Sequence, residues 1–283
     1  MNGHLFIYDE ENKLVAFQSG SLLSNRFFIF LGGLSDGFLC LPYLQKLSSE
    51  LENKFKDYSL VQVLLRSSYF QYGWHSIDND IEDLQKLINY LIQNRKNLQS
   101  IVLMGHSTGC QDIIHYLRQE KTPKKQIIQI ILQGPVSDRQ YLTRQSIIND
   151  QLKYCYENQS NPFEWLPRSL HFPPLTINRC QSLIEKYSVE DLFSSDLSDE
   201  DLKQIYQNIE IPIAWIWSKK DQYVPDDIKD EVMNFVQNKL ANRTNSSFLL
   251  LEEADHFIHD EKQQNILINF ILHVLSSRES FSD

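Results

Sequence analysis

Short apolar segments alternate with amphipathic segments along most of the chain, and this alternation restricts the fold more than any other feature. Segments of strand type lie at 27–31, 60–65, 101–104, 127–132, 211–217 and 248–251, and two weaker ones lie at 5–8 and 14–18. Apolar residues recur at helical spacing between them, as in Ile81, Leu84, Leu87, Ile88, Leu91 and Ile92. Strands that alternate with helices form mostly parallel sheets covered on both faces. The sequence therefore predicts an α/β fold with a mostly parallel twisted sheet.

The alternation is interrupted once, by a long segment of mixed character. From about residue 140 to about 208, helical patterns are mixed with loops rich in proline and aromatic residues. Connections between a strand and a helix usually have roughly two to six residues, so this length indicates an insertion. We expect a single domain over residues 1–283 with a cap inserted at about 140–208.

Residue type predicts the beginnings of two helices. Pro42 suits the first turn of a helix with an apolar face, because proline lacks the N–H that this turn leaves unpaired. Asp80 is the expected N-cap of the next helix, since a carboxylate can accept a bond from the first free N–H groups. Later helices are expected at 228–240 and around 266–275.

Charge and cysteine content exclude several classes of function. The 283 residues carry 27 Lys and Arg against 37 Asp and Glu, so no global basic field attracts nucleic acid. The four cysteines form no C-x-x-C pair, which indicates free thiols in a reducing compartment. No apolar stretch approaches the roughly 20 residues of a membrane span, and the N-terminus lacks the apolar core of a signal peptide. We expect a cytoplasmic protein that neither spans a membrane nor binds nucleic acid.

The segment Gly105-His106-Ser107-Thr108-Gly109 stands directly between an apolar strand, IVLM, and a helical segment, CQDIIHYLRQ. A serine on such a tight turn adopts strained backbone angles, and the flanking glycines let the strand and the helix approach closely. An ordinary turn with an inert serine is the alternative. The position between strand and helix favours a nucleophile elbow with Ser107 at its tip.

A serine hydroxyl is a weak nucleophile at neutral pH, so Ser107 needs a base that an acid orients. Asp221 follows the predicted strand 211–217, and His256 follows the strand 248–251. Both loops come at the carboxyl ends of strands, where open α/β sheets bind ligands. The order Ser, Asp, His is that of α/β-hydrolases, so we assign Asp221 as the acid and His256 as the base.

Each partner has an alternative. Asp138 follows the strand 127–132 and could be the acid, and His259 could be the base. Asp221 could also be a turn former, and His256 a packed residue. His106, inside the elbow, is expected to pack or hydrogen-bond rather than act as the base.

The reaction also needs N–H donors for the negative charge of a tetrahedral intermediate. Thr108, directly after the nucleophile, should supply the first donor. The second should come from the turn after the strand 27–31, where either Gly33 or Leu34 is the donor. A plain tight turn would also explain these glycines.

The insertion supplies candidate substrate contacts. Its apolar and aromatic residues could line a lid or an acyl pocket, or could form the cap's own core: Tyr154, Tyr156, Phe163, Trp165, Leu166, His171 and Phe172. Its arginines could meet a substrate carboxylate or could simply be solvated: Arg139, Arg144, Arg168 and Arg179. No metal or cofactor motif is present, and the histidines are dispersed, so we expect neither a cofactor nor a metal.

Four segments together resemble a known family: MGHSTGCQDIIHY, LGGLSDGF, LRSSYFQYGWHSIDND and ILQGPVSDR. They are similar to the α/β-hydrolases that include the fungal fusarinine C esterases, which open ester bonds in hydroxamate siderophores. The resemblance covers nearly the whole chain. It implies an α/β-hydrolase fold with Ser107 as nucleophile, Asp221 as acid and His256 as base.

The function expected from the sequence is that of a serine hydrolase acting on carboxylic esters of a small molecule through an acyl-enzyme. A lipase or thioesterase would share this chemistry and differ in its pocket. A binding or scaffold protein that retains the hydrolase fold is an alternative from a different class. The sequence predicts no oligomeric state.

Overall fold

A single mixed sheet runs through the molecule. The structure, a computed structural model, describes residues 1–119, 124–171, 173–242 and 245–279. In these ranges eight strands have the order β1-β2-β4-β3-β5-β6-β7-β8. Their bounds are Gly3–Asp9 (β1), Leu14–Gly20 (β2), Arg26–Leu31 (β3), Tyr58–Val63 (β4), Ser100–His106 (β5), Ile127–Gln133 (β6), Ile213–Ser218 (β7) and Ser246–Leu251 (β8). β1 and β2 pair antiparallel with their neighbours and all other pairs are parallel, which confirms the predicted sheet.

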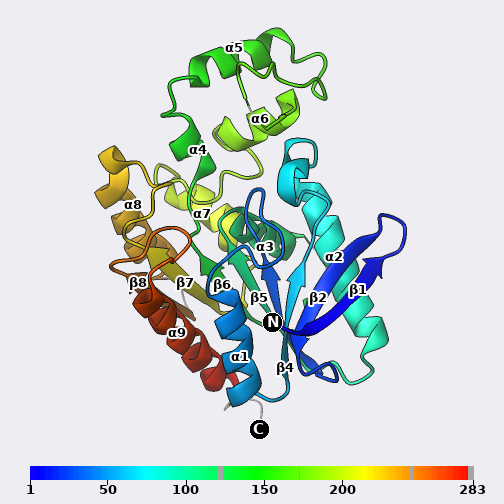
Figure 1. Cartoon of the computed structure of the whole chain (residues 1–283). Helices are drawn as coiled ribbons and strands as arrows, with labels where there is room; N and C mark the ends of the chain where they lie inside the picture. Colours follow the sequence, from blue (N-terminus) through cyan, green and yellow to red (C-terminus); the bar gives the residue numbers. More distant parts are fainter. Residues whose placement is uncertain (120–123, 172, 243–244, 280–283) are drawn as a thin grey trace.

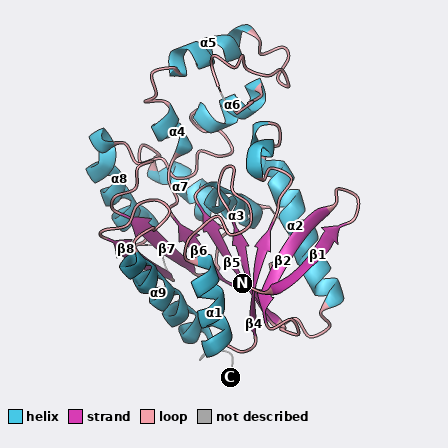
Figure 2. Ribbon diagram, viewed as in Figure 1, coloured by secondary structure: helices cyan, strands magenta, loops and turns pink. Residues whose placement is uncertain are grey.

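Helices cover both faces of this sheet (Figures 1 and 2). The α-helices are Leu44–Lys54 (α1), Ile77–Asn94 (α2), Thr108–Arg118 (α3), Asp138–Leu142 (α4), Ile148–Glu157 (α5), Ile177–Ile184 (α6), Asp199–Tyr206 (α7), Lys229–Phe235 (α8) and Glu261–Glu279 (α9). Shorter turns lie at Tyr69–Gly73 (η1), Asp226–Ile228 (η2) and Val236–Leu240 (η3). Residues of α1 and α9 pack on one face of the sheet, and residues of α2, α3, α7 and α8 pack on the other. None of the helices in the described ranges is long and apolar enough to cross a membrane.

The central strands are apolar throughout because both of their faces are buried. In β3, Phe27 and Ile29 pack on the face of α2 and α3, whereas Phe28 and Phe30 pack on the face of α1 and α9. Side chains of a strand alternate between faces, so a strand covered on both sides reads as an unbroken apolar run. This burial fixes the register that brings the carboxyl ends of β3, β5, β6, β7 and β8 to one edge.

Two predicted helix starts were wrong. The N-cap of α2 is Ser76, whose backbone N–H donates to Asn79 Oδ1 at 3.1 Å, and Asp80 is a buried residue within the helix. The apolar face of α2 already begins at Ile77, so the helix starts one turn earlier than the carboxylate suggested. Pro42 precedes the N-cap of α1, Tyr43, and lies outside the first turn.

The β6–β7 connection, residues 134–212, contains α4 to α7. Figure 1 shows α5 and α6 beyond the carboxyl ends of the strands, apart from the other helices. These two helices share a small apolar cluster that includes Cys155, Leu166 and Cys180. In contrast, Leu202 and Tyr206 of α7 pack into the main core. The part of the connection with its own core is therefore shorter than the connection itself.

Candidate active site

The chain leaves β3 and β5 in opposite directions. After β3 it continues to α1 on one face of the sheet, and after β5 it continues to α3 on the other face. Loops that diverge in this way open a crevice at the carboxyl edge, where α/β proteins bind their ligands. The turn after β3 and the GHSTG segment after β5 therefore meet at the point where a ligand site is expected.

Ser107 lies in a strained backbone conformation between β5 and α3. Its φ is 53° and its ψ is −125°, a region that residues other than glycine rarely adopt. A Cβ at Gly105 would lie 2.5 Å from the carbonyl oxygen of Gly109, and one at Gly109 would lie 2.6 Å from that of Leu31. Both glycines are thus required for strand and helix to approach closely, as the sequence pattern predicts.

Asp221 and His256 meet at the ends of two neighbouring strands, β7 and β8. His256 Nδ1 lies 2.6 Å from Asp221 Oδ2, and each side chain is nearly completely buried. Asp221 Oδ1 accepts a bond from the Tyr223 backbone N–H at 2.9 Å, and the His256 N–H donates to Gln222 Oε1 at 3.1 Å. The carboxylate therefore fixes the tautomer and the direction of the imidazole, so that Nε2 is left to accept a proton.

The alternative acid and base have other partners. Asp138 Oδ2 accepts a bond from Gln111 Nε2 at 2.8 Å. His259 lies in the loop before α9, where its Nδ1 is 2.6 Å from Asp255 Oδ2 on the exposed surface. The geometry thus brings together Asp221 and His256 rather than Asp138 and His259.

A buried hydrogen-bond network, which was not predicted from the sequence, holds the backbone of His256 in place. His106 Nδ1 donates to Gln133 Oε1 at 2.7 Å, and the Tyr43 hydroxyl donates to the same oxygen at 3.0 Å. Gln133 Nε2 donates in turn to the His256 carbonyl at 3.0 Å. Burial lowers the pKa of His106 well below its usual value, so its ring is neutral. His106 thus packs and hydrogen-bonds as expected. The sequence signal for this hydrogen-bond network was a glutamine, Gln133, at the end of an apolar strand.

The turn after β3 lies directly against the nucleophile candidate. A Cβ at Gly33 would be 2.7 Å from Ser107 Cβ, so only glycine fits there. The Gly33 N–H donates to Asp36 Oδ2 at 2.6 Å, and the Asp36 N–H donates to the Gly33 carbonyl at 3.0 Å. Of the two N–H groups expected as oxyanion donors, that of Gly33 is therefore already bonded to Asp36. The N–H of Leu34 has no hydrogen-bond acceptor among the described residues.

A cavity of about 190 Å³ opens at this edge of the sheet, and we refer to it as the edge cavity. Its wall is formed by the turn 33–36, His106, Ser107, Val136, Asp138, Tyr141, Leu142, Tyr223, His256 and Phe257. Ser107 and His256 thus face one space. Phe163 and Trp165 of the connection lie exposed elsewhere and do not line it, and Phe172 lies outside the described residues.

The edge cavity is acidic. Burial raises the pKa of Asp138 to about 6 and also raises the pKa of Asp36. Within the described chain, no lysine or arginine lines this cavity. Three of the four arginines that could have met a substrate carboxylate bind acidic residues: Arg139 binds Asp191, Arg144 binds Asp227 and Arg179 binds Glu190. The fourth, Arg168, does not line the edge cavity.

No group of three or more His, Cys, Asp or Glu side chains suited to a metal ion occurs in the described ranges. The four cysteines are free thiols, three of them buried. The polar side chains that line the edge cavity carry hydroxyl, imidazole and carboxyl groups.

The chain is similar to several known proteins. It is 30% identical over 310 aligned positions to a UPF0613 protein from Schizosaccharomyces pombe, covering 98% of this chain and 97% of that one. It is 26% identical to the fusarinine C esterase sidJ from Aspergillus fumigatus, with 88% of each chain covered. A solved structure of the siderophore hydrolase EstB from Aspergillus fumigatus superimposes with a TM-score of 0.73 at 28% identity, covering 98% of this chain and 97% of that one.

The fold of this chain is that of the α/β-hydrolases, as a second solved structure called an alpha/beta hydrolase fold protein of unknown function also indicates, at a TM-score of 0.73. The family described as "Protein of unknown function (DUF1749)" matches residues 1–276, nearly the entire sequence. The family match, the sheet topology and the relatives named as esterases agree with one another. The chain is therefore a member of the DUF1749 family and has the α/β-hydrolase fold.

Proposed function

We propose that this protein is a serine hydrolase that cleaves carboxylic esters of a small molecule. The observation that carries the proposal is the short contact between His256 Nδ1 and Asp221 Oδ2, in a cavity that also contains Ser107 on its strained turn. A buried carboxylate that orients an imidazole toward a hydroxyl is the arrangement that activates serine nucleophiles. Relatives named as an esterase and a siderophore hydrolase support the same reaction class.

The proposed reaction has two halves. Ser107 Oγ attacks the ester carbonyl carbon and its proton passes to His256 Nε2; the bond to the alcohol oxygen then breaks, and that oxygen takes the proton. Water, deprotonated by His256, attacks the acyl-enzyme and releases the acid and free Ser107. Asp221 stabilises the imidazolium in both halves without itself accepting the proton.

Two backbone N–H groups would bind the oxyanion. Thr108 is the first residue of α3, so its N–H has no partner within the helix. Of the two candidates in the opposite turn, we assign Leu34, because Asp36 already holds the N–H of Gly33. Asp36 then acts as a positioning residue that fixes the turn against Ser107.

The size of the edge cavity favours small esters over long acyl chains. Its volume of about 190 Å³ is below the roughly 300–1,000 Å³ of most ligand pockets. We also propose that α5 and α6 form a cap within a single domain, since they lie beyond the carboxyl edge of the sheet with a cluster of their own. A lipase would need a longer apolar trough than this cavity offers.

The decisive experiment is covalent labelling with a fluorophosphonate, read by intact mass, together with turnover of p-nitrophenyl acetate and longer esters. We expect one label on the wild type and none on Ser107→Ala, with a loss of kcat on the order of 10⁶. Ser35→Ala, which removes a second hydroxyl from the same cavity, is the matched control and should keep the label. A folded wild type without label would favour a binding or scaffold protein. Siderophore esters belong in the assay because of the named relatives.

A further inference from the structure

One wall of the edge cavity is aromatic, and two carboxyl groups, those of Asp36 and Asp138, line the same cavity. The rings of Tyr141 and Tyr223 meet edge to face at 5.1 Å, and Tyr223 meets Phe257 in the same way at 6.3 Å. Asp138 is the first residue of α4, the helix that also carries Tyr141. Aromatic faces and a carboxylate that share a small cavity are the groups that proteins use to bind an ammonium ion.

Asp138 has no part in the proposed proton transfers, although the sequence marked it as an alternative acid. His256 is held by Asp221 instead. The Asp138 side chain accepts a bond from Gln111 Nε2, and part of its surface remains accessible at the cavity. Burial of this carboxylate is costly, as its raised pKa of about 6 indicates, and needs a reason.

Arg179 acts on Asp138 electrostatically, and its guanidinium has other partners. Arg179 Nε donates to the Tyr72 carbonyl at 2.9 Å, and its Nη1 pairs with Glu190. Arg179 is also shared electrostatically with Asp80 and Asp112. Burial raises the pKa of Asp80 to about 7 and also raises that of Asp112, so these two carboxyls hold their protons to higher pH. Arg179 is paired with Glu190, and the carboxyls that line the cavity are those of Asp36 and Asp138.

We propose that Asp138, together with Tyr141 and Tyr223, selects esters that bear an ammonium group a few atoms from the scissile carbonyl. This inference rests on the proposed ester hydrolysis and names its substrate class. The carboxylate attracts the cation, the aromatic faces bind its alkyl groups, and the ester carbonyl then reaches Ser107 at the other side of the same cavity.

The test compares isosteric esters that differ only in charge. One pair is acetylcholine with 3,3-dimethylbutyl acetate, where the charge is on the alcohol; the other is methyl 6-aminohexanoate with methyl heptanoate, where it is on the acyl group. Product release is followed by NMR at pH 8. In at least one pair the wild type should favour the cationic ester in kcat/KM by roughly ten- to hundredfold. For the primary ammonium this is the size of a hydrogen bond to a charged group, and for the quaternary ammonium, which has no N–H, the lower end is that of a desolvated cation–π contact.

Two variants locate the effect. Asp138→Asn should reduce the preference to about one by lowering kcat/KM for the cationic ester, while the neutral ester changes little. The control Asp226→Asn removes the same charge from a fully solvated position in η2, where its side chain is 96% exposed, and should keep the preference. A preference that survives in Asp138→Asn, or wild-type ratios near one in both pairs, would overturn the inference.

Failure of the inference and failure of the proposed function can be told apart. Neutral esters cleaved in a Ser107-dependent manner, without charge preference, would leave the hydrolase and remove the cation site. If Asp138→Asn does not fold, inhibition of wild-type neutral-ester turnover by choline against 3,3-dimethylbutanol gives the same comparison. If no ester is cleaved, NMR saturation transfer to these two alcohols on Ser107→Ala still tests the cation site, and equal binding would refute it.

Discussion

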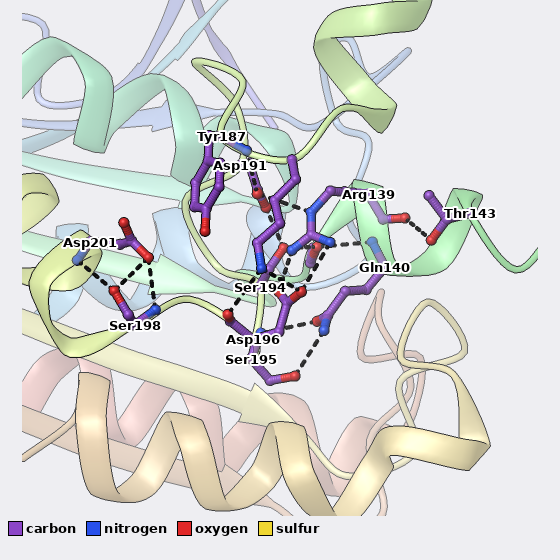
Figure 3. A network of polar contacts seen from close by, with 12 residues as sticks. Arg139, Gln140, Thr143, Tyr187, Asp191, Ser194, Ser195, Asp196, Ser198 and Asp201 are labelled. Carbon is purple, nitrogen blue, oxygen red and sulfur yellow. Dashed lines mark hydrogen bonds and ion pairs between the residues drawn. The ribbon is translucent and has the colours of Figure 1, made fainter. Parts of the chain in front are cut away.

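The carboxyl edge of the sheet and the β6–β7 connection hold their side chains in place by different means. At the edge, Gln133, Asp221 and His256 lie in loops or strand ends of one sheet. Gln133 Nε2 donates to the His256 carbonyl at 3.0 Å, and His256 Nδ1 lies 2.6 Å from Asp221 Oδ2. In the connection, Arg139 binds Asp191 and Asp196, which lie more than fifty residues further along the chain (Figure 3). The strands of the sheet bring these polar side chains within hydrogen-bond distance of one another. In the connection, ion pairs join segments that are far apart in the sequence.

The surfaces of the two regions differ as well. Polar groups at the sheet edge are buried, whereas Phe163 and Trp165 of the connection are exposed and meet Trp74 at ring distances of 6.0 and 5.3 Å. The polar groups of the edge are thus shielded from solvent, whereas part of the connection's aromatic surface is not. Four predictions test this contrast.

The largest effect is expected from Asp221→Asn at the edge. The variant should lose about 10⁴ in kcat, because an amide stabilises the wrong tautomer of His256. Asp255→Asn is the control, since Asp255 makes an equally short contact of 2.6 Å with an exposed histidine, His259. Steady-state kinetics on a small ester would check both. A comparable loss in the two variants would contradict the assignment of the base.

The second effect concerns the ion pairs of the connection. Asp191 is fully buried and binds Arg139 Nε at 2.9 Å, while Asp196 binds the same guanidinium but is 41% exposed. Asp191→Ala should lower the free energy of unfolding by about 3 kcal/mol, because it removes the buried carboxylate that accepts from Arg139 Nε, the Tyr187 N–H and Ser194 Oγ and leaves these donors unsatisfied. Asp196→Ala should cost less than about 1 kcal/mol. Urea denaturation measures the two, and equal losses would show that the contacts are equivalent.

The third effect is a dependence of stability on pH at Asp138. The folded-state pKa of about 6 lies above the ordinary value of 3.8, so the folded protein holds this proton more tightly. Its contribution to stability is therefore present below about pH 4, is lost as pH rises to 6, and stays lost above it. At pH 8, Asp138→Asn should be more stable than the wild type by about 3 kcal/mol.

Thermal denaturation at pH 4 and pH 8 separates this from a structural role. The two proteins should differ little at pH 4, and the variant should melt higher at pH 8. Arg179 and His256 lower the pKa of Asp138. The pH range over which stability changes should therefore also be measured in a His256→Ala variant. A variant that melts lower at both values would mean that Asp138 serves the fold.

The smallest effect is expected for the exposed aromatic residues of the connection. Trp165→Ala removes a ring that is 45% exposed and lies outside the edge cavity. We expect a loss of less than about 1 kcal/mol in stability and less than twofold in kcat/KM for a small ester. A large rise in KM would instead place this surface in the path of the substrate.

Much of the fold could be predicted because its signals are local. Each of the eight expected strands is present, and in the central strands burial on both faces selects continuous apolar runs. The turn at Ser107 was also predictable, because Gly105 and Gly109 are required wherever a strand and a helix approach so closely. Errors occurred at helix ends, where Ser76 and Asn79 rather than Asp80 supply the cap of α2.

Other features depend on contacts between distant segments. The bond between Gly33 and Asp36 decides which N–H is left beside Ser107, and a one-residue difference in a turn has no signature in composition or spacing. Gln133 reads as one more residue of an apolar strand, yet it supports both His106 and His256. The aromatic residues of the connection could not be assigned to core or cavity without knowing where α5 and α6 lie.

The sequence by itself determined the order of strands and helices, the strained turn at Ser107 and the loops at one edge of the sheet, because these follow from local periodicity and from glycine spacing. Only the tertiary structure decided which acid serves His256. Asp138 and Asp221 both follow strands at that edge, and β6 and β7 are neighbours. A hydrogen bond forms only within a distance range of about 1 Å and only for suitable side-chain directions. The order of residues along the chain specifies neither. The same geometry leaves Asp138 facing the cavity.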